Sequence, residues 1–518
     1  MDAKSPYNYY YYSPSIAIIF AACLLISRVV YALFFSSYCH IPGPSICKVT
    51  RLWVDLYDIF LRRNQQIYKW HQEYGPVILI APGQVSVSSA ASTKMIYRAG
   101  TQHPKSSFFN NFTLYGERTI FTALGCMEHR AMRKTTFAFY QPTTVYSDAV
   151  MLPLRRRVRR FVDELSNSAH AESTVVGADI FKLTNSYAFD NITSLVYGPS
   201  HTSQSLDSEK EKQTILQDWA ECEIWNNLLY AFPLAHRFIK FAMTHLKNPH
   251  FLHAEQRLFE WNMERLDSTL RDIDTAATGE SLVGRLLKDK KGSSNAPRKT
   301  LVAAECLDNI HAAQTTVSLA LTYTIWLLAV HRSWQREVRN ELQSLPLEED
   351  GLPCFDAIRK KAPVLEACLC ESLRTRPLSS GRAERIVPET NLYDDVMIPA
   401  GTIISTSTIA IQHNPHVFQN PHFYDPGRWL RADKDELRAM ESCYIPFGYG
   451  ARLCLGKAFA VAEIKLLLAC LLLNFDIYEN EQSGTNATTM GQLGTENALP
   501  RGLRCDVLFR RLQKSVKP

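Results

Sequence analysis

The residues best suited to chemistry lie in one short segment near the C-terminus, which reads Phe-Gly-Tyr-Gly-Ala-Arg-Leu-Cys-Leu-Gly from Phe447 to Gly456. Its cysteine, Cys454, is followed by Lys457 to Phe475, a stretch rich in Ala and Leu and free of Gly and Pro, which predicts a helix. A cysteine just before a helix meets free backbone N–H groups that favour the thiolate, the form that binds metals. The neighbouring glycines leave room for a flat group beside the sulfur, and Arg452 presents a fork of donors suited to a carboxylate.

Five positions of this segment are in register with a known pattern. Phe447, Gly450, Arg452, Cys454 and Gly456 match Phe-x-x-Gly-x-Arg-x-Cys-x-Gly, so the segment resembles the haem-binding loop of the cytochromes P450. A buried, inert thiol is the usual fate of a free cysteine, but the combined matches favour a ligand. The resemblance implies haem b held by a Cys454 thiolate, with Phe447, Gly450 and Arg452 among the cofactor-binding residues.

Further cations fit the same cofactor. His129 and Arg133 are four residues apart and share one face of a predicted helix. Such a pair is usually a solvated surface patch, but this segment resembles the family's helix that binds the haem propionates. Arg385, in Arg-Ile-Val-Pro, resembles the strand arginine that reaches a propionate.

A long helix is predicted from Thr300 to Val330, where 31 residues contain no Gly or Pro. Polar residues in its first half leave too short an apolar remainder for a membrane span. It resembles the family's central distal helix, with the oxygen-activation motif at residues 311–316. Thr316 takes the threonine position and Thr315 the acidic one, so both are predicted to be catalytic. The usual acid is missing, and we expect protons to pass through water.

A structural cluster is also expected. Glu371 and Arg374 lie three residues apart on a predicted helix and match the family's Glu-x-x-Arg, and Arg428 matches its second arginine. An exposed pair of this kind contributes little to stability. The resemblance implies a buried cluster that fixes the core rather than performing chemistry.

These residues must be positioned by a large domain behind a membrane anchor. The apolar run Ser15 to Phe35 is long enough to cross a bilayer, and Pro-Gly-Pro at 42–44 resembles the hinge of microsomal family members. We therefore predict an anchor over residues 1–40 and a haem-thiolate catalytic domain over 41–518. The expected fold is mainly α with a small β portion, and short strands are predicted at 77–80 and 85–87.

Composition excludes several classes of protein. With 46% hydrophobic and 21% charged residues the chain is not disordered, and a net charge of +6 without basic tracts argues against a nucleic-acid partner. Thirteen cysteines without a Cys-x-x-Cys pair indicate a reducing compartment.

The resemblance implies a membrane-anchored monooxygenase, apparently of fungal type, acting on a small lipophilic metabolite of a secondary pathway. Electrons are expected from an NADPH–cytochrome P450 reductase, because the chain has no flavin or iron–sulfur motif. The expected location is the endoplasmic reticulum membrane, single-pass, with the catalytic domain in the cytoplasm. Two alternatives stay open: a haem-thiolate isomerase or dehydratase that needs no reductase, and a non-enzymatic haem sensor.

Overall fold

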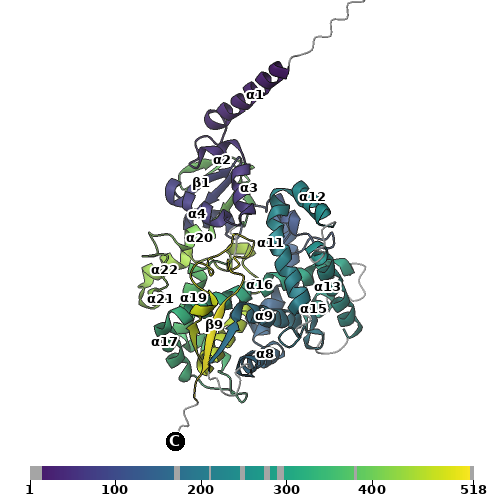
Figure 1. Ribbon diagram of the computed structural model, residues 1–518, viewed down its shortest axis with the longest axis vertical. Helices are drawn as coiled ribbons and strands as arrows, with labels where there is room; N and C mark the ends of the chain where they lie inside the picture. The colour runs from purple at the N-terminus through teal and green to yellow at the C-terminus, as the bar shows by residue number, and fades with distance from the viewer. Residues whose placement is uncertain are drawn as a thin grey trace, which may run out of the picture.

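The N-terminal helix stands apart from the rest of the chain. In the computed structural model, residues 14–167, 175–208, 212–244, 251–273, 280–288, 297–378 and 382–513 are described. Helix α1 (Pro14–Phe34) projects from the top of the domain (Figure 1). Its residues 16–34 have a mean hydropathy of 2.4 and are 6% buried, so α1 is a candidate membrane span at the predicted place.

The remaining chain is mostly helical, as predicted. Its α-helices are α2 (Ser45–Val49), α3 (Leu52–Ile59), α4 (Arg63–Tyr74), α5 (Ala90–Tyr97), α6 (Cys126–Thr136), α7 (Pro142–Val145), α8 (Asp148–Asn167), α9 (Ile180–Tyr197), α11 (Gln217–Ala231), α12 (Pro233–Thr244), α13 (Ala254–Arg271), α15 (Leu282–Lys288), α16 (Lys299–Val330), α17 (Arg332–Gln343), α18 (Phe355–Lys361), α19 (Pro363–Thr375), α20 (Thr408–Gln412), α21 (Gly427–Arg431), α22 (Lys434–Cys443) and α23 (Lys457–Asn474). Short 3-10 turns that matter below are η1 (Ser107–Phe112) and η6 (Gly450–Arg452).

Three small sheets make up the β portion. The first has the order β1 (Val77–Ala81), β2 (Gln84–Val87), β7 (Ile403–Thr406), β4 (Arg385–Ile386), in which only the β2–β7 pair is parallel. The second is antiparallel, in the order β3 (Val175–Asp179), β9 (Asp506–Arg511), β8 (Phe475–Glu479). The third pairs β5 (Asn391–Tyr393) with β6 (Val396–Ile398). The first sheet contains both predicted strands and brings β4, with its arginine, into the domain.

Helix α16 crosses the centre of the domain (Figure 1). It is apolar on all sides over its second half, and 83% of its most apolar window is buried, so it is a core helix and not a second membrane span. The helix runs from Lys299 to Val330, which confirms the predicted bounds to within one residue. It packs along α9 and against α19 and α23, so a residue on α16 has a fixed position relative to the cysteine segment.

The expected structural cluster is present and buried. The Arg374 guanidinium donates to both Glu371 oxygens at 2.8 and 2.7 Å, and Arg428 Nε donates to Glu371 Oε1 at 3.0 Å. Side chains of Glu371 and Arg374 are 0% exposed. The indole N–H of Trp429 donates to the second Glu371 oxygen at 2.9 Å, so both carboxylate oxygens are satisfied. The cluster ties α19 to α21 ahead of the cysteine segment.

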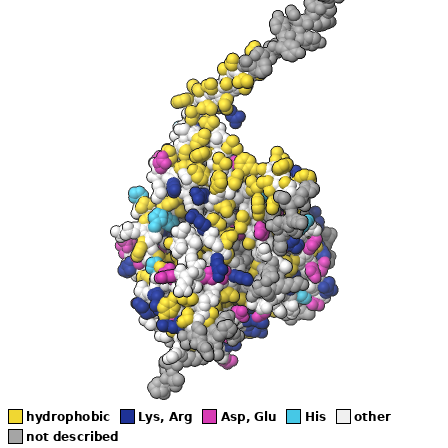
Figure 2. All heavy atoms as spheres, in the orientation of Figure 1, with side chains coloured by type: hydrophobic (Ala, Val, Ile, Leu, Met, Phe, Trp, Pro, Cys, Tyr) yellow, Lys and Arg dark blue, Asp and Glu magenta, His cyan; other side chains and the backbone are white. Residues whose placement is uncertain are grey.

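An apolar surface continues from α1 onto the domain. Figure 2 shows hydrophobic side chains along α1 and over the adjoining top of the domain, where α2, α3 and α12 lie in Figure 1. On α12, the side chains of Leu234, Phe238 and Phe241 are 79%, 70% and 66% exposed, and Leu52 and Phe60 beside α3 are 56% and 68% exposed. Large exposed apolar patches of this kind mark contact with a membrane or a partner.

Candidate functional site

The cysteine segment forms a tight loop before α23. The Cys454 amide donates to the Phe447 carbonyl at 2.9 Å, which closes the loop. Gly450 has a φ of +70°, and a Cβ there would lie 1.9 Å from the Tyr97 carbonyl oxygen, so only glycine fits. Gly450 therefore shapes the loop from behind and is not part of the cavity wall described next. Gly456 has nothing within 4 Å of the place a Cβ would take, so the space beside it is open.

Cys454 faces a cavity of about 450 Å³ in the interior of the domain. Its wall comes from α16, α6, α23, the cysteine loop, the segment from Lys105 to Phe121, and the loop 494–497. Phe447 and Arg452 line the same cavity, as do the small side chains of Ala312 and Ala313 on α16. A volume of this size is typical of a site for a cofactor or small molecule.

The electrostatics of the thiol differ in one respect from the expectation. The backbone N–H groups of Gly456 and Lys457 do favour the Cys454 thiolate, as does the charge of Arg133. Burial outweighs them, and the net effect raises the pKa of the thiol above its ordinary value. The side chain of Cys454 is nevertheless exposed to the cavity, where a cofactor could reach the sulfur.

The predicted cations do meet in the cavity wall. Arg133, Arg385 and Arg452, here called the cation end, come from α6, β4 and the cysteine loop. Arg452 donates to the carbonyls of residues 123, 124 and 125 at 2.7, 3.0 and 3.2 Å, and Arg133 donates to the Leu453 carbonyl at 2.9 Å. Within the described part of the chain, none of the three guanidinium groups has a carboxylate within 4.0 Å.

The pKa of His129 reflects the same excess of positive charge. The ring is 6% exposed and lines the cavity. Burial, then the charges of Arg452 and Arg133, lower the pKa of His129 to about 3, so the ring is neutral and serves as a hydrogen-bonding group rather than a cation.

The residues fit a haem. Arg385 is buried, and among the described residues no carboxylate lies within 4.0 Å of any of the three guanidinium groups, so they are available to anions from outside the chain. Two propionates at the cation end would supply them, with Cys454 in reach of the iron and Gly456 leaving space for the ring. The donor set thus suits a flat, dianionic group with an axial thiolate, and it suits neither a nucleotide nor a free metal ion.

Helix α16 presents one of its two adjacent threonines, Thr315 and Thr316, to the cavity. Thr316 lines the cavity, and its hydroxyl donates to the Ala312 carbonyl one turn back at 2.7 Å. Thr315 is 4% exposed and lies outside the cavity wall, where its hydroxyl donates to Gln314 Oε1 at 2.9 Å. The two side chains diverge because neighbouring helix residues point about 100° apart. The structure therefore brings Thr316 into one cavity with Cys454 and directs Thr315 toward α9.

Several residues of the cavity wall carry no motif and were missed. Lys105 is 6% exposed and lies over the rings of Phe109 and Phe121 at 3.8 and 4.2 Å. Burial and the charges of Arg385 and Arg452 hold the pKa of its ammonium well below the usual value. In the sequence, the one indication that this lysine is part of a site is that several phenylalanines follow it closely. Asp308 on α16 and Glu496 in the loop 494–497, here called the acid end, also line the cavity.

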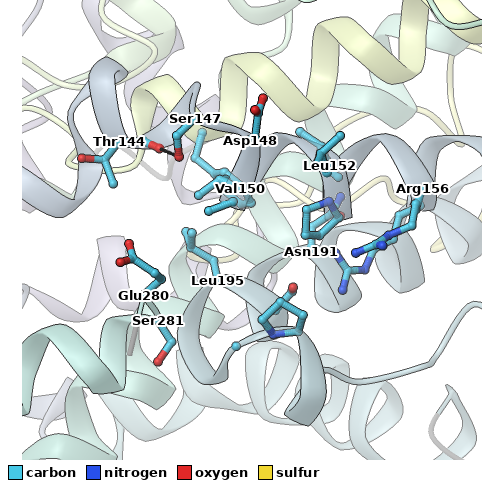
Figure 3. A pocket seen from close by; sticks show the side chains of 18 residues that line it. Thr144, Ser147, Asp148, Val150, Leu152, Arg156, Asn191, Leu195, Glu280 and Ser281 are labelled. Carbon is cyan, nitrogen blue, oxygen red and sulfur yellow. Dashed lines mark hydrogen bonds between the residues drawn. The ribbon is translucent and has the colours of Figure 1, made fainter. Parts of the chain in front are cut away.

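A second cavity, of about 270 Å³, lies between α8, α9 and the start of α15 (Figure 3). Its wall includes Asp148, Arg156, Asn191 and Glu280. It contains neither Cys454 nor any residue of the cation end. The predicted chemistry therefore belongs to the larger cavity.

Comparison with known proteins identifies the family. A model of the family described as cytochrome P450 matches residues 48–499. Cytochrome P450 monooxygenase FGM1 of Gibberella zeae is 38% identical over 91% of this chain and 92% of its own. Cytochrome P450 monooxygenase ORF9 of Penicillium roqueforti is 28% identical over 89% and 88%, and a fusicoccadiene 8-ol C-16 hydroxylase of Alternaria brassicicola is 26% identical over 87% and 89%.

These matches span the cysteine loop, α16 and the Glu371 cluster, whose geometry was derived above without them. The chain belongs to the cytochrome P450 family and is an oxidoreductase of its monooxygenase type.

Proposed function

We propose that the protein inserts one atom of O2 into a small lipophilic metabolite of a fungal secondary pathway, with haem b as cofactor and an NADPH–cytochrome P450 reductase as electron donor. The observation that carries the proposal is the meeting of Cys454, the cation end and Thr316 in one internal cavity. The fungal relatives support the pathway class, since one of them is named for the hydroxylation of a fusicoccadiene derivative.

Each of the predicted site residues has a proposed role. Cys454 would bind the haem iron, and Arg133, Arg385, Arg452 and neutral His129 would hold the propionates. When bound, haem supplies the redox chemistry, and thiolate ligation favours O–O cleavage. Phe447 and Gly450 keep the loop in the shape that presents the sulfur.

Thr316 manages protons at the reacting end of the cavity. Its Oγ1 donates to the Ala312 carbonyl and retains lone pairs that can accept from a water in the cavity. Thr315 supports it indirectly, because the bonds from Thr315 to Gln314 and from Gln314 to Asn185 fasten this turn of α16 to α9. No carboxyl stands next to Thr316, so the hydroxyl relays protons from water.

The exposed surface suits the proposed partners. Arg130, Lys134 and Lys457 are exposed on α6 and at the start of α23, on the outer side of the elements that hold Cys454. A basic face of this kind favours docking of an acidic reductase. The apolar tops of α3 and α12 would rest on the membrane that α1 would cross, which supports a membrane-bound domain. Its location on the cytoplasmic side of the endoplasmic reticulum is part of the proposal.

Reconstitution in microsomes tests the proposal. The reduced, CO-treated protein should show the strongly red-shifted Soret band of thiolate ligation, and product formation should require both NADPH and reductase. Metabolite profiles after gene deletion would supply the substrate. Product formed without NADPH would favour the isomerase, and a haem that binds no lipophilic ligand would favour the sensor.

A further inference from the structure

Lys105 is tied through its backbone to two members of the cation end. It pairs with Arg385 of β4 in an antiparallel β-bridge. Residues directly opposite one another in such a pair place their side chains on the same face, so the Lys105 side chain lies beside that of Arg385. The Lys105 amide also donates to the Leu124 carbonyl at 3.0 Å, and the same oxygen accepts from Arg452 Nη2 at 3.0 Å. Lys105 therefore belongs to the same part of the cavity wall as two guanidinium groups.

The Lys105 side chain is buried without a counter-charge. It is 6% exposed and lines the cavity. Its Nζ donates to the Phe121 carbonyl and lies 3.8 and 4.2 Å from the centres of the Phe109 and Phe121 rings. Among the described residues, it forms no ion pair within 4.0 Å. A buried lysine normally has an anionic partner, and its ammonium has three donors, so two of them remain for a ligand in the cavity.

Charged groups from four different parts of the chain act on the Lys105 amine. Burial has the largest effect, and the charges of Arg385 and Arg452 add to it, so the pKa of Lys105 lies well below its ordinary value of 10.5. Asp308 and Glu496 oppose this shift with smaller effects. The haem-free chain therefore favours the neutral amine, and an anion placed beside the nitrogen would favour the ammonium instead.

We propose that Lys105 is a fourth cation for the haem propionates, and that its amine takes up a proton when a propionate carboxylate reaches it. This inference rests on the proposed haem site and adds a residue that no motif marks. One proton passes from solvent to the nitrogen lone pair, and no bond to the cofactor forms or breaks.

The arrangement has a physical reason. Guanidinium groups stay charged at neutral pH, so Arg133, Arg385 and Arg452 are cations with or without haem. A fourth permanent charge beside them would raise the cost of the haem-free fold, because buried like charges without anions repel one another. A lysine avoids that cost, since its amine is neutral until the carboxylates arrive.

A purely structural lysine would behave differently. If the ammonium were held only by the Phe121 carbonyl and the two phenyl rings, its replacement would change the stability of the loop and leave the propionates unaffected. The test therefore observes the propionates directly. Its two readouts are the rate of haem transfer to apomyoglobin and the propionate deformation band of the resonance Raman spectrum, which responds to hydrogen bonds at the carboxylates.

The variants are made in the full-length, haem-loaded protein. Lys105→Met removes the charge at similar length, and Lys105→Arg keeps a permanent charge at the same place. Lys434→Met, at an exposed lysine of α22 outside the cavity wall, is the matched control. We expect haem release about tenfold to a hundredfold faster in Lys105→Met, the usual effect of losing a hydrogen bond between charged groups, together with a shifted propionate band. Lys434→Met should change neither readout.

The pH dependence isolates the proton. Haem release from the parent should quicken as the pH rises toward 10.5, because the amine then loses the proton that holds the carboxylate. Lys105→Met and Lys105→Arg should lack this alkaline dependence. His129, with a pKa of about 3, titrates only in acid, and the proton that Cys454 would release on binding iron is common to parent and variants. Both therefore cancel in the difference between parent and variant.

Equal haem release by the parent and Lys105→Met, an unchanged propionate band in Lys105→Met, or an alkaline dependence that persists in this variant would overturn the inference. If Lys105→Met binds no haem, the parent decides, because its propionate band must shift over the same alkaline range as its haem release, and an unshifted band contradicts the inference. A red-shifted CO band in the parent leaves the proposed function standing in each of these cases. Absence of that band contradicts the proposed function itself.

Discussion

The charged groups at both ends of the cavity are incompletely paired with groups of opposite charge. At the cation end these groups are guanidinium groups, and at the acid end they are carboxyl groups. At the cation end, Arg133, Arg385 and Arg452 donate to backbone carbonyls and have no carboxylate within 4.0 Å among the described residues. At the acid end, burial raises the pKa values of Asp308 and Glu496 to about 6 and about 8, and no ion pair within 4.0 Å among the described residues offsets it. The residues of the cation end match motifs of the family, so a family pattern reveals them. Asp308 and Glu496 match no motif of the family, so no pattern marks them.

Removal of the sulfur should have the largest effect on the cation end. In Cys454→Ala, haem loses its axial ligand, so we expect complete loss of the red-shifted band in the reduced CO spectrum and of NADPH-dependent turnover. Cys354→Ala, at a half-buried cysteine outside the cavity wall, should retain both. A Cys454→Ala protein with an unchanged band would show that another residue holds the iron.

Removal of one cation should weaken, without abolishing, the hold on haem. Arg452→Ala loses the bonds to three backbone carbonyls and one propionate partner, and we expect about tenfold to hundredfold weaker haem binding, measured by transfer of haem to apomyoglobin. Arg438→Ala, on the 79% exposed side chain of α22, is the control. Unchanged transfer in Arg452→Ala would mean that the cation end does not bind the propionates.

Thr316 belongs to neither end of the cavity, and its loss should affect chemistry while binding at both ends persists. Positioned proton transfer contributes about a hundredfold or more, so in Thr316→Ala we expect product formed per NADPH to fall at least about tenfold, with release of hydrogen peroxide. Haem content and ligand affinity should not change. Thr315→Ala should be the milder lesion, because its hydroxyl bonds Gln314 outside the cavity. If Thr315→Ala had the larger effect instead, the threonine that manages protons would be Thr315, one residue earlier on α16.

The acid end should also make stability depend on pH. Glu305, one turn before Asp308, has its pKa raised to about 8 by burial and by Asp308, and among the described residues its Oε2 has no hydrogen-bond partner. The folded chain therefore holds a proton that the unfolded chain releases near pH 4.5, so its stability falls as the pH rises between these two values.

Glu305→Gln removes that proton linkage and should become more stable relative to the parent across the same range, by at most about 1.4 kcal/mol per pH unit. Thermal unfolding at several pH values measures the difference. Parallel curves for parent and variant would show that Glu305 is ionised in the folded protein.

The cysteine loop, the Glu371–Arg374 pair and the long helix were predicted from the sequence because their residues are close together in the chain, whereas Arg428 was assigned to the cluster by the family resemblance. Cys454 and Arg452 are two residues apart, Glu371 and Arg374 share a helix face, and α16 contains no residue that breaks a helix. Local helix geometry also distinguishes Thr316 from Thr315. Neighbouring residues of a helix point in different directions, so only one of the two side chains can face the cavity.

The tertiary structure alone decided the rest of the cavity. Lys105, Asp308 and Glu496 are distant in the sequence and belong to no motif, yet they line one wall because η1, α16 and the loop 494–497 pack together. The structure also reversed the expected balance at Cys454, where burial exceeds the effect of the helix N-terminus on the pKa of the thiol. Both outcomes depend on desolvation, which is set by the atoms that surround a group in the fold and not by its neighbours along the chain.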